Sequence, residues 1–393
     1  MQNQTRLLLL SLTLAVFAVI TTEVAVIGLL PQLINQLHIT ATQVGFLVSI
    51  YALVVALSGP FITLIFGRFN RKIILLSIML LFLLSNSLYA LTERYEVILL
   101  FRILPALTHA LFFAVALHLA ANTVPPEKST QGVAIVFSGV AIGMVFGVPL
   151  SAFIAETFSL RIAFWFAAIA SGLALVGIAF HVPSTQITAP LKVSEQVQIL
   201  KKGIVWLSML TVTLIFSAMF SGFSFIADYL INISHFSNNA TSTLLIVFGV
   251  SGYIGNFIFS HYLQRNAIQT TLIYPLIFAL IYFALWLWGS HSLVVIPLVI
   301  IWGIFHTSGL IVSQSWLMSK ANTAPEFANS LYISFSNLGI TIGTMVGGWI
   351  LQFAGIAAIT WAGLIFALLA FISIWLRLYL VRKTDIIVYQ STN

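Results

Sequence analysis

Long apolar segments alternate with short polar interruptions along the whole chain. A helix needs about 20 predominantly apolar residues to cross the hydrocarbon core of a bilayer. Segments of about this length, with boundaries placed to within a few residues, lie at 7–30, 43–65, 73–91, 98–121, 132–155, 161–182, 204–227, 240–262, 271–289, 293–318, 327–352 and 355–380. The pattern therefore predicts an all-α membrane protein with twelve transmembrane helices.

The longest polar interruption divides these segments into two groups of six. It covers 183–203 and reads PSTQITAPLKVSEQVQILKKG. We therefore predict an N-terminal six-helix half (1–182), a cytoplasmic linker (183–203) and a C-terminal six-helix half (204–393). The external loops are short, so no sizeable soluble domain is predicted on either side of the membrane.

A sequence repeat with an offset of 200 residues relates the two halves. The tetrapeptide Asn122-Thr123-Val124-Pro125 recurs as Asn322-Thr323-Ala324-Pro325. The glycines of the helix that follows also recur, as the pairs Gly139 and Gly339, Gly143 and Gly343, and Gly147 and Gly347. Two parallel six-helix repeats are the arrangement expected of a transporter whose halves are related by an axis along the membrane normal.

Glycine every four residues lines one face of the predicted fifth and eleventh helices, at Gly143 and Gly147 and again at Gly343 and Gly347. A face without side chains lets a neighbouring backbone come close. Two interpretations stay open at this point. The glycines either serve tight helix packing, or they form a seam against the opposite half that slides or rocks during alternating access.

Composition excludes a soluble protein and several kinds of chemistry. The chain is 60% hydrophobic and only 6% charged, whereas soluble proteins carry about 25% charged residues. Cysteine is absent, which excludes disulfides, thiolate metal sites and cysteine nucleophiles. The first apolar segment follows Arg6, is too long for a signal peptide and runs into Glu23 without a cleavage site, so we expect a retained first span.

The distribution of the 16 lysines and arginines predicts the orientation. If the N-terminus is cytoplasmic, thirteen of them fall inside, Arg94 and Arg161 fall outside, and Arg102 lies within a span. We therefore expect a multi-pass protein of the cytoplasmic (inner) membrane with both termini cytoplasmic. The net charge of +7 is then a topology signal, so the lipid bilayer is an expected partner and nucleic acid is not.

Few ionisable residues lie inside the predicted spans, where charge is costly and usually faces a cavity or a partner. Glu23 lies about 24 Å along the first span, and Arg102 has a similar depth in the fourth span. His109 follows Arg102 by about two turns, so it lies on the same face. Burial and a nearby cation act oppositely on the proton affinity of a carboxylic acid, so these three residues are predicted to carry a proton. Alternatively, Arg102 reaches the outer interface and His109 only packs; His118 lies on the opposite face and is interpreted as structural.

The second half offers weaker candidates. Asp228 ends the seventh span, which mirrors the first, and it follows Phe220 and Phe223 in FSGFSFIADYL. It is expected either at an outer gate or binding site, or as a solvated helix terminus. His306 in the tenth span, within WGIFHTSGL, is a further intramembrane candidate.

Several motifs together resemble the major facilitator superfamily, in particular its drug:proton antiporter group and the bacterial sugar-efflux transporters. TTEVAVIGLLPQL is similar to the first-span motif of this group, and VSIYALVVAL with Tyr51 to its second span. RILPALTHALFF carries the fourth-span arginine and the sugar-exporter histidine at Arg102 and His109. GMVFGVPL resembles the fifth-span antiporter motif, at the positions Gly143, Gly147 and Pro149.

One family motif is incomplete in this chain. The loop between the second and third spans usually reads Gly-x-Leu-x-Asp-Arg-x-Gly-Arg-Lys, and here it reads TLIFGRFNRK. The matching basic residues are Arg68, Arg71 and Lys72. Gly67 replaces the aspartate, which puts the usual charge relay of the cytoplasmic gate in question.

The resemblance implies a proton-coupled exporter of small neutral sugars or sugar-like compounds, in which Glu23 couples proton entry to substrate exit and Arg102 and His109 tune it. The energy source is then the proton gradient, with no cofactor, and we expect a monomer. The substrate is expected in a cavity between the halves, whose candidate lining residues are Tyr51, Phe113, Phe220, Phe223, Tyr253, Tyr332 and Asn337, with Asp228 and His306.

Three alternatives remain at this stage. A multidrug:proton antiporter is disfavoured mildly because Glu23 is the only acid deep inside a span. An importer of the same fold is disfavoured only by the resemblance of the fifth-span motif to exporters. A membrane-embedded enzyme is not expected, because no metal-ligand set and no nucleophile–base pair stands out in the sequence.

Overall fold

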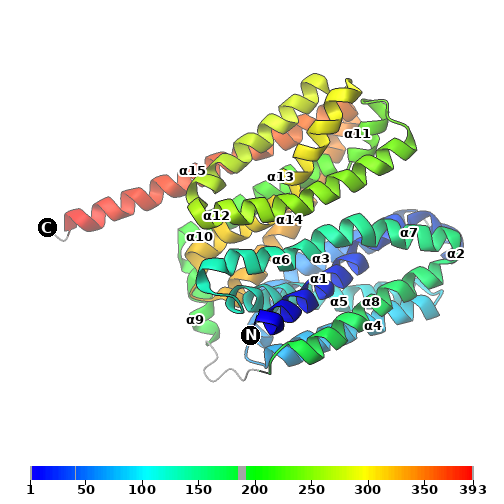
Figure 1. The fold of residues 1–393 in the computed structure, drawn as a ribbon, viewed down its shortest axis with the longest axis horizontal. Helices are drawn as coiled ribbons and strands as arrows, with labels where there is room; N and C mark the ends of the chain where they lie inside the picture. The colour runs from blue at the N-terminus through cyan, green and yellow to red at the C-terminus, as the bar shows by residue number, and fades with distance from the viewer. Residues whose placement is uncertain (1, 40, 185–191, 392–393) are drawn as a thin grey trace. The chain divides into compact units, whose positions relative to one another are not determined.

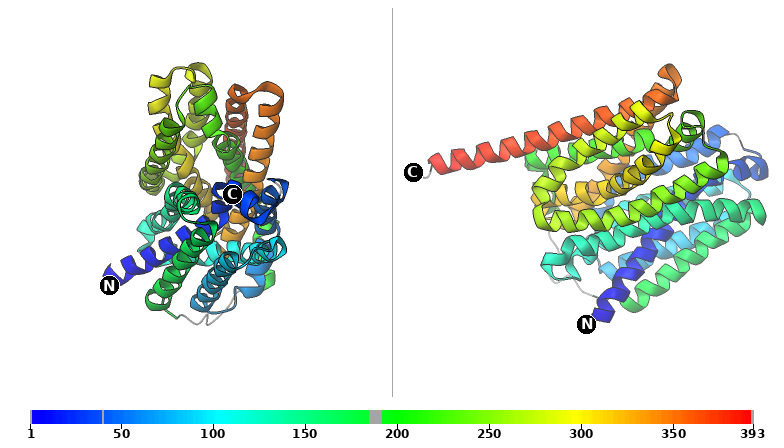
Figure 2. Two further views of the ribbon diagram at one scale, coloured as in Figure 1. Left: turned by 90° about the vertical axis from the view of Figure 1, so that its right-hand side faces the viewer. Right: turned by 45° about the horizontal axis from the view of Figure 1, so that its top comes forward.

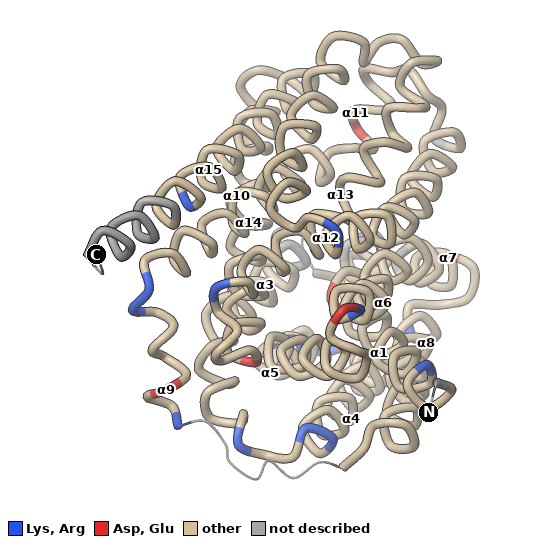
Figure 3. The backbone as a smooth tube through the Cα atoms, turned by 60° about the vertical axis from the view of Figure 1, so that its left-hand side comes forward, with Lys and Arg blue, Asp and Glu red and all other residues tan. Residues whose placement is uncertain are grey.

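The computed structural model describes residues 2–39, 41–184 and 192–391, and within these it is helical with no β-strand (Figure 1). Eleven of the described helices are long and apolar enough to cross a membrane. The all-α membrane architecture predicted from the sequence is therefore confirmed. Charged residues are sparse along these helices and gather near their ends and turns (Figure 3).

The first half contains five long helices and three shorter ones, with a 3-10 turn and a π-helical turn between them. They are α1 (Gln2–Gly28), α2 (Leu30–Leu37), α3 (Ala41–Phe66), α4 (Arg71–Leu91), α5 (Tyr95–Asn122), η1 (Pro126–Lys128), α6 (Ser129–Ile142), η2 (Gly143–Gly147), α7 (Val148–Thr157) and α8 (Leu160–His181). The predicted fifth span is thus α6, η2 and α7 together. In this half α4 packs against α8, α3 against α5, and α1 against α6 and α8 (Figure 2).

The second half begins after the linker and contains five long helices. Its elements are α9 (Val193–Val197), η3 (Gln198–Lys201), α10 (Gly203–Phe223), α11 (Ile226–Asn232), α12 (Asn238–Trp288), α13 (Ser292–Ala321), α14 (Pro325–Ala354), η4 (Ile356–Ala358) and α15 (Ile359–Ser391). Here α12 packs against α13 and α15, and α10 packs against α13 and α15.

The predicted eighth and ninth spans run on as one element, α12, so the twelve predicted spans occupy ten long helices and the joined segment of α6, η2 and α7 among the described residues. Its 51 residues correspond to about 76 Å of helix, more than twice the hydrocarbon thickness of about 30 Å. The backbone leaves helical geometry at Asn266 (φ −152°, ψ 87°). The connecting residues contain no proline or glycine, so helical hydrogen bonding continues up to this break on both sides.

Asn266 also starts the second part of α12. Its side-chain oxygen accepts a hydrogen bond from the Gln269 backbone N–H at 3.0 Å. This is the bond made by an N-cap residue, which satisfies one of the free amides at a helix start. The break at Asn266 lies between the predicted spans 240–262 and 271–289, so two crossings joined there agree with the predicted topology.

The chain divides into two units. The first contains 1–196 and 324–334, and the second contains 197–323 and 335–393. Helix α14 therefore begins in the first unit and continues in the second. Residues 185–191 of the predicted linker lie outside the described residues, so the domain boundaries predicted at 183 and 203 stay a prediction.

The sequence repeat corresponds to a repeated contact between the first and fifth spans of each half. The Thr13 hydroxyl donates to the Ile135 carbonyl at 3.0 Å, and the Thr213 hydroxyl donates to the Phe335 carbonyl at 3.1 Å. Both residues of the second bond lie 200 positions after those of the first. The two halves therefore share one packing register as well as one sequence pattern.

The glycine faces pack within their own units. A Cβ atom added at Gly139 would clash with the Thr13 carbonyl oxygen, and one added at Gly339 would clash with the Thr213 carbonyl oxygen. Gly343 and Gly347 likewise meet backbone oxygens of α10, whereas Gly143 and Gly147 meet side-chain atoms of α1. This geometry supports tight packing. The alternative, a seam against the opposite half that moves during alternating access, stays a prediction.

Pro149 follows the π-helical turn η2 (Gly143–Gly147) and lies in the first turn of α7 with an exposed side chain. Proline lacks an N–H and therefore cannot donate to the carbonyl four residues earlier. A π-turn is one of the few ways in which a helix accommodates such a break without ending. The fifth-span motif thus corresponds to the π-helical turn between α6 and α7.

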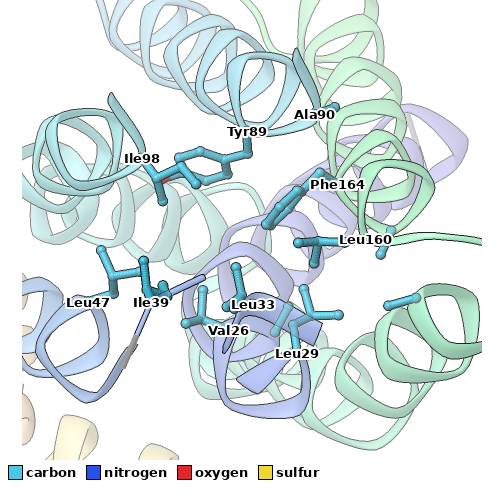
Figure 4. Close-up of a cluster of buried hydrophobic side chains, with 13 residues drawn as sticks. Val26, Leu29, Leu33, Ile39, Leu47, Tyr89, Ala90, Ile98, Leu160 and Phe164 are labelled. Carbon is cyan, nitrogen blue, oxygen red and sulfur yellow. The ribbon is translucent and has the colours of Figure 1, made fainter. Parts of the chain in front are cut away.

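An apolar cluster closes the end of the first half where α1 passes into α2 (Figure 4). Leu33 of α2 and Leu47 of α3 are fully buried in it, and Tyr89 of α4 lies near Ile98. The Tyr89 hydroxyl donates to the Phe101 carbonyl at 2.7 Å. Leu47 of this cluster also accepts a hydrogen bond, through its carbonyl oxygen, from Arg102 of α5.

Candidate functional site

Arg102 of α5 is buried, with 1% of its surface exposed. Its guanidinium donates to the carbonyl oxygens of Leu47 at 3.1 Å and Thr22 at 2.6 Å, and also to that of Glu23. The guanidinium carbon lies 4.6 Å from the centre of the Tyr51 ring. The first and fourth spans are therefore in contact at Glu23 and Arg102, as predicted. The contact consists of hydrogen bonds from Arg102 to backbone carbonyl oxygens, not of an ion pair with the Glu23 carboxylate.

This burial contradicts the alternative in which Arg102 reaches the outer interface. A carbonyl oxygen has two lone pairs, so the helix carbonyls of α1 can accept from Arg102 in addition to their helical bonds. A cation–π contact with Tyr51 adds to the stabilisation of the buried charge. Arg102 therefore ties α1 and α3 to α5.

His109 lies two turns further along α5 and is 3% exposed. Its Nδ1 is 2.9 Å from the Tyr51 hydroxyl, and its Nε2 is 4.0 Å from the Glu23 carboxylate. The Phe113 ring lies 5.0 Å from the imidazole ring. The structure thus brings Glu23, His109 and Tyr51 into one chain of polar groups, beside Arg102.

This chain has two proton arrangements. If the Tyr51 hydroxyl donates to Nδ1, the neutral imidazole carries its proton on Nε2, toward Glu23; if Nδ1 carries the proton, Nε2 is free to accept one. The Glu23 side chain is 20% exposed, more than that of His109. The 4.0 Å between the Glu23 carboxylate and His109 Nε2 is longer than a direct hydrogen bond, so proton exchange between them requires a bridging water or a side-chain rotation.

A polar contact missed by the sequence reasoning supports this site. Asn86 of α4 donates to the Thr22 hydroxyl at 2.9 Å and to the Ser171 hydroxyl at 3.4 Å. The Thr22 hydroxyl in turn donates to the Ala18 carbonyl at 2.8 Å. The available signal was an asparagine in the middle of an apolar span, where an amide needs partners.

Most of the other predicted binding residues of α3, α5 and α14 are buried. Tyr51 is 1% and Phe113 is 2% exposed, and both contact His109. Tyr332 is fully buried and packs edge-on against Phe137 at 6.0 Å. Asn337, on the part of α14 that belongs to the second unit, is 5% exposed.

The second half brings three predicted residues together. Phe220 and Phe223 of α10 contact His306 of α13, with ring centres 5.5 and 4.6 Å away. Tyr253 is 40% exposed and its ring contact is with Phe257, so it lies apart from this group. Asp228 is exposed in the short helix α11, which fits the alternative of a solvated terminus.

A second charged cluster lies at the turn between α3 and α4. Arg71 donates through Nε to the Glu326 carboxylate, and His118 Nε2 lies 3.9 Å from the same oxygen. Glu326 was missed by the sequence reasoning, and His118 was interpreted as structural only. The available signal for Glu326 was an acid directly after Pro325 in the repeated loop.

The same cluster explains the incomplete loop motif. A Cβ atom at Gly67, where the family has an aspartate, would lie 3.9 Å from Glu326 Oε2. An acid at position 67 would therefore face a second carboxylate. Two other residues of the motif lie outside this cluster. Arg68 is exposed, and its guanidinium carbon lies 5.3 Å from the centre of the Phe69 ring. The Lys72 backbone N–H donates to the Asn70 side chain at 2.9 Å.

Arg377 of α15 is a further buried cation that the sequence reasoning placed at the cytoplasmic surface. It is 2% exposed and donates to the Ser208 hydroxyl at 2.9 Å, the Trp316 carbonyl at 2.6 Å and the Ser319 hydroxyl at 2.6 Å. Its guanidinium carbon lies 3.7 Å from the centre of the Trp316 ring. Like Arg102, it ties three helices together. The described residues contain no group of three or more metal-binding side chains.

The family model of the Major Facilitator Superfamily matches residues 12–326. The chain belongs to this superfamily. It is similar to a protein of Mannheimia succiniciproducens named a probable sugar efflux transporter, with 29% identity over 89% of this chain and 88% of the relative. It is also similar to the inner membrane transport protein YdhP of Escherichia coli K12, with 28% identity over 88% of each chain.

A solved structure has the same fold. The human organic anion transporter MFSD10 superposes with a TM-score of 0.76 over 94% of this chain and 99% of the other, at 13% identity. The protein is therefore a multi-pass membrane transporter of small molecules and not an enzyme.

Proposed function

We propose that this transporter is a proton-coupled exporter of small neutral sugars or sugar-like compounds, located in the cytoplasmic membrane with both termini in the cytoplasm. The observation that carries the proposal is the chain of Glu23, His109 and Tyr51 beside the buried Arg102. The names of the similar proteins, a sugar efflux transporter and an inner membrane transport protein, support the substrate class and the location.

The coupling follows from the charges. Arginine does not lose its proton in proteins, so Arg102 is a fixed positive charge held by backbone carbonyls. Glu23 and His109 are the groups beside it that can exchange a proton. Proton uptake by Glu23 from the outside removes its negative charge, which changes its interaction with Arg102 and favours release of substrate on that side. Proton loss to the cytoplasm then resets the cycle, with the proton gradient as the energy source and no cofactor.

The test is transport in proteoliposomes, with and without an imposed proton gradient. Glu23→Gln keeps the size and polarity of the side chain but cannot ionise. We expect it to abolish gradient-driven flux of arabinose or isopropyl-thiogalactoside, while gradient-independent exchange of labelled for unlabelled sugar continues. Glu156→Gln, at an exposed acid of α7, is the matched control and is expected to transport like the parent.

Gradient-driven flux in Glu23→Gln at the parent rate contradicts the coupling role. A multidrug:proton antiporter is the second candidate, because the rings of Phe220, Phe223 and Phe248 suit lipophilic drugs as well. Ethidium and chloramphenicol are therefore included as substrates. Flux of these drugs without any flux of sugars favours the second candidate. We expect the purified protein to be a monomer.

A further inference from the structure

His306 of the second half lies in an aromatic cage. The cage is formed by Phe220 and Phe223 of α10 and Phe248 of α12, whose ring centres lie 5.5, 4.6 and 5.2 Å from that of the imidazole. Phe223 and Phe248 stack on each other at 5.3 Å. Trp302, one turn before His306 on α13, lies edge-on to Phe248 at 5.5 Å. All of these residues belong to the second unit.

One nitrogen of the imidazole in this cage has no hydrogen-bond partner among the described residues. His306 is 3% exposed, and its Nδ1 is buried with no hydrogen-bond partner within the described residues. Leaving a buried donor or acceptor unpaired costs free energy, so such a group is rare unless a ligand or water pairs with it. Phe220 and Phe223 are only partly buried, so the cage is not closed on their side.

The 200-residue repeat shows which residues of the first half correspond to those of the cage. Gly147 packs against Thr21 in the first half, and Gly347 packs against Ser221 in the second, so position 223 corresponds to position 23. The loops after α5 and α13 are also in register, so position 302 corresponds to position 102. The second half therefore has Phe223 in place of the acid Glu23 and Trp302 in place of Arg102.

This replacement removes charge from the second site while keeping its place in the fold. A site without a carboxylate has little to attract a cationic ligand beyond the ring faces, and it has no fixed cation to bind an anion. Aromatic rings bind apolar groups, and the faces of sugars with outward C–H groups, through burial and stacking. A single polar atom then fixes the orientation of the ligand.

We propose that Phe220, Phe223, Phe248 and His306 form a binding site for an uncharged ligand that carries both an apolar group and hydroxyls, such as an alkyl or aryl glycoside. The apolar substituent packs against the phenyl rings, and one hydroxyl pairs with His306 Nδ1. The inference rests on the proposed function for the sugar class, and it adds that recognition lies in the second half while proton exchange lies in the first.

The experiment measures equilibrium binding to the purified full-length protein in detergent, with no proton gradient. Labelled isopropyl-thiogalactoside is compared with galactose, which has the same ring without the apolar substituent. We expect the parent to prefer the thiogalactoside. Phe223→Ala is expected to weaken thiogalactoside binding by about five- to tenfold, the usual range for loss of one aromatic contact, and to change galactose binding by less than about twofold.

Two further variants separate the roles within the cage. Phe223→Leu keeps apolar volume if the alanine variant fails to fold, and is expected to show the same selective loss. His306→Phe keeps a ring but removes both nitrogens, so it is expected to weaken binding of both sugars. Phe283→Ala is the matched control on α12, because Phe283 is 39% exposed and stacks on Trp286 away from His306; it is expected to bind like the parent.

Parent-like thiogalactoside affinity in both Phe223 variants overturns the inference, as does equal affinity of the parent for the two sugars. Tighter binding of ethidium that also depends on Phe223 overturns the assignment to uncharged ligands. The two proposals fail separately. Normal binding by the cage variants alongside loss of gradient-driven flux in Glu23→Gln removes only this inference, whereas cage-dependent binding without gradient-driven flux in the parent removes only the coupling.

Discussion

At the scale of single residues, the buried Arg102 decides how the first-half site works. A buried ion pair loses much of its attraction to desolvation, whereas backbone carbonyls are dipoles already fixed by the helices and need no such ordering. Leu47, Thr22 and Glu23 supply these carbonyls. The hydrogen bonds that stabilise the buried Arg102 charge are therefore made whether or not the Glu23 side chain is ionised. The carboxylate is thus free to gain and lose a proton without releasing α5 from α1.

The Tyr51 hydroxyl is the most specific test of this arrangement. Tyr51→Phe removes the group 2.9 Å from His109 Nδ1 but keeps the ring beside Arg102. We expect gradient-driven flux to fall about tenfold, the rate equivalent of one lost hydrogen bond of about 1.4 kcal/mol, with sugar exchange retained. Tyr95→Phe, which loses only a bond to the Gln43 carbonyl at 3.2 Å, is the control. If both variants transport alike, Tyr51 does not orient His109 for proton exchange.

At the scale of helices, the glycines of α6 and α14 set the distance to α1 and α10. Gly139→Ala and Gly339→Ala each place a Cβ well under 3.0 Å from a backbone oxygen, which a rigid helix cannot avoid without moving. We therefore expect both to lower the melting temperature of the purified protein, by about 2–6 °C for a loss of one to two kcal/mol.

Gly172→Ala is the matched control for these two variants. Its Cβ would meet only Leu83 Cδ1, at an ordinary 3.7 Å, and alanine is the better helix former. It is expected to keep or raise the melting temperature. Equal effects at positions 139, 172 and 339 would show that the close approach does not matter. The repeat predicts that the losses at 139 and 339 are similar.

The helices themselves were predictable because each span is a long apolar run, and the repeat was predictable because its glycines and loop are in register. The continuity of α12 was not predicted, because the short polar interruption at 263–270 was interpreted as a loop, although it contains no proline or glycine. At the site, Glu23, Arg102 and His109 stood out as ionisable residues in apolar spans. Glu326 and Phe248 did not, since their roles depend on neighbours from distant segments.

At the scale of the whole molecule, α14 is shared by the two units. Its first residues carry Glu326, which pairs with Arg71 at the α3–α4 turn and lies near His118. We infer that the acid missing from the loop motif at Gly67 has been replaced by Glu326. A Cβ at position 67 would lie 3.9 Å from Glu326 Oε2. An acid at either position is therefore close enough to pair with Arg71.

A double-variant cycle tests this exchange. Gly67→Asp places a second carboxylate beside Glu326, so we expect it to lower the melting temperature by about 1–3 °C more than Gly67→Ala, which has the same steric contact with the Thr63 carbonyl. In a Glu326→Gln background the order is expected to reverse, because the introduced aspartate becomes the acid available to Arg71. Gly67→Asp and Gly67→Ala behaving identically in both backgrounds would mean that positions 67 and 326 do not share one charge role. The reversal is the decisive outcome, since a purely steric effect at position 67 does not depend on the residue at 326.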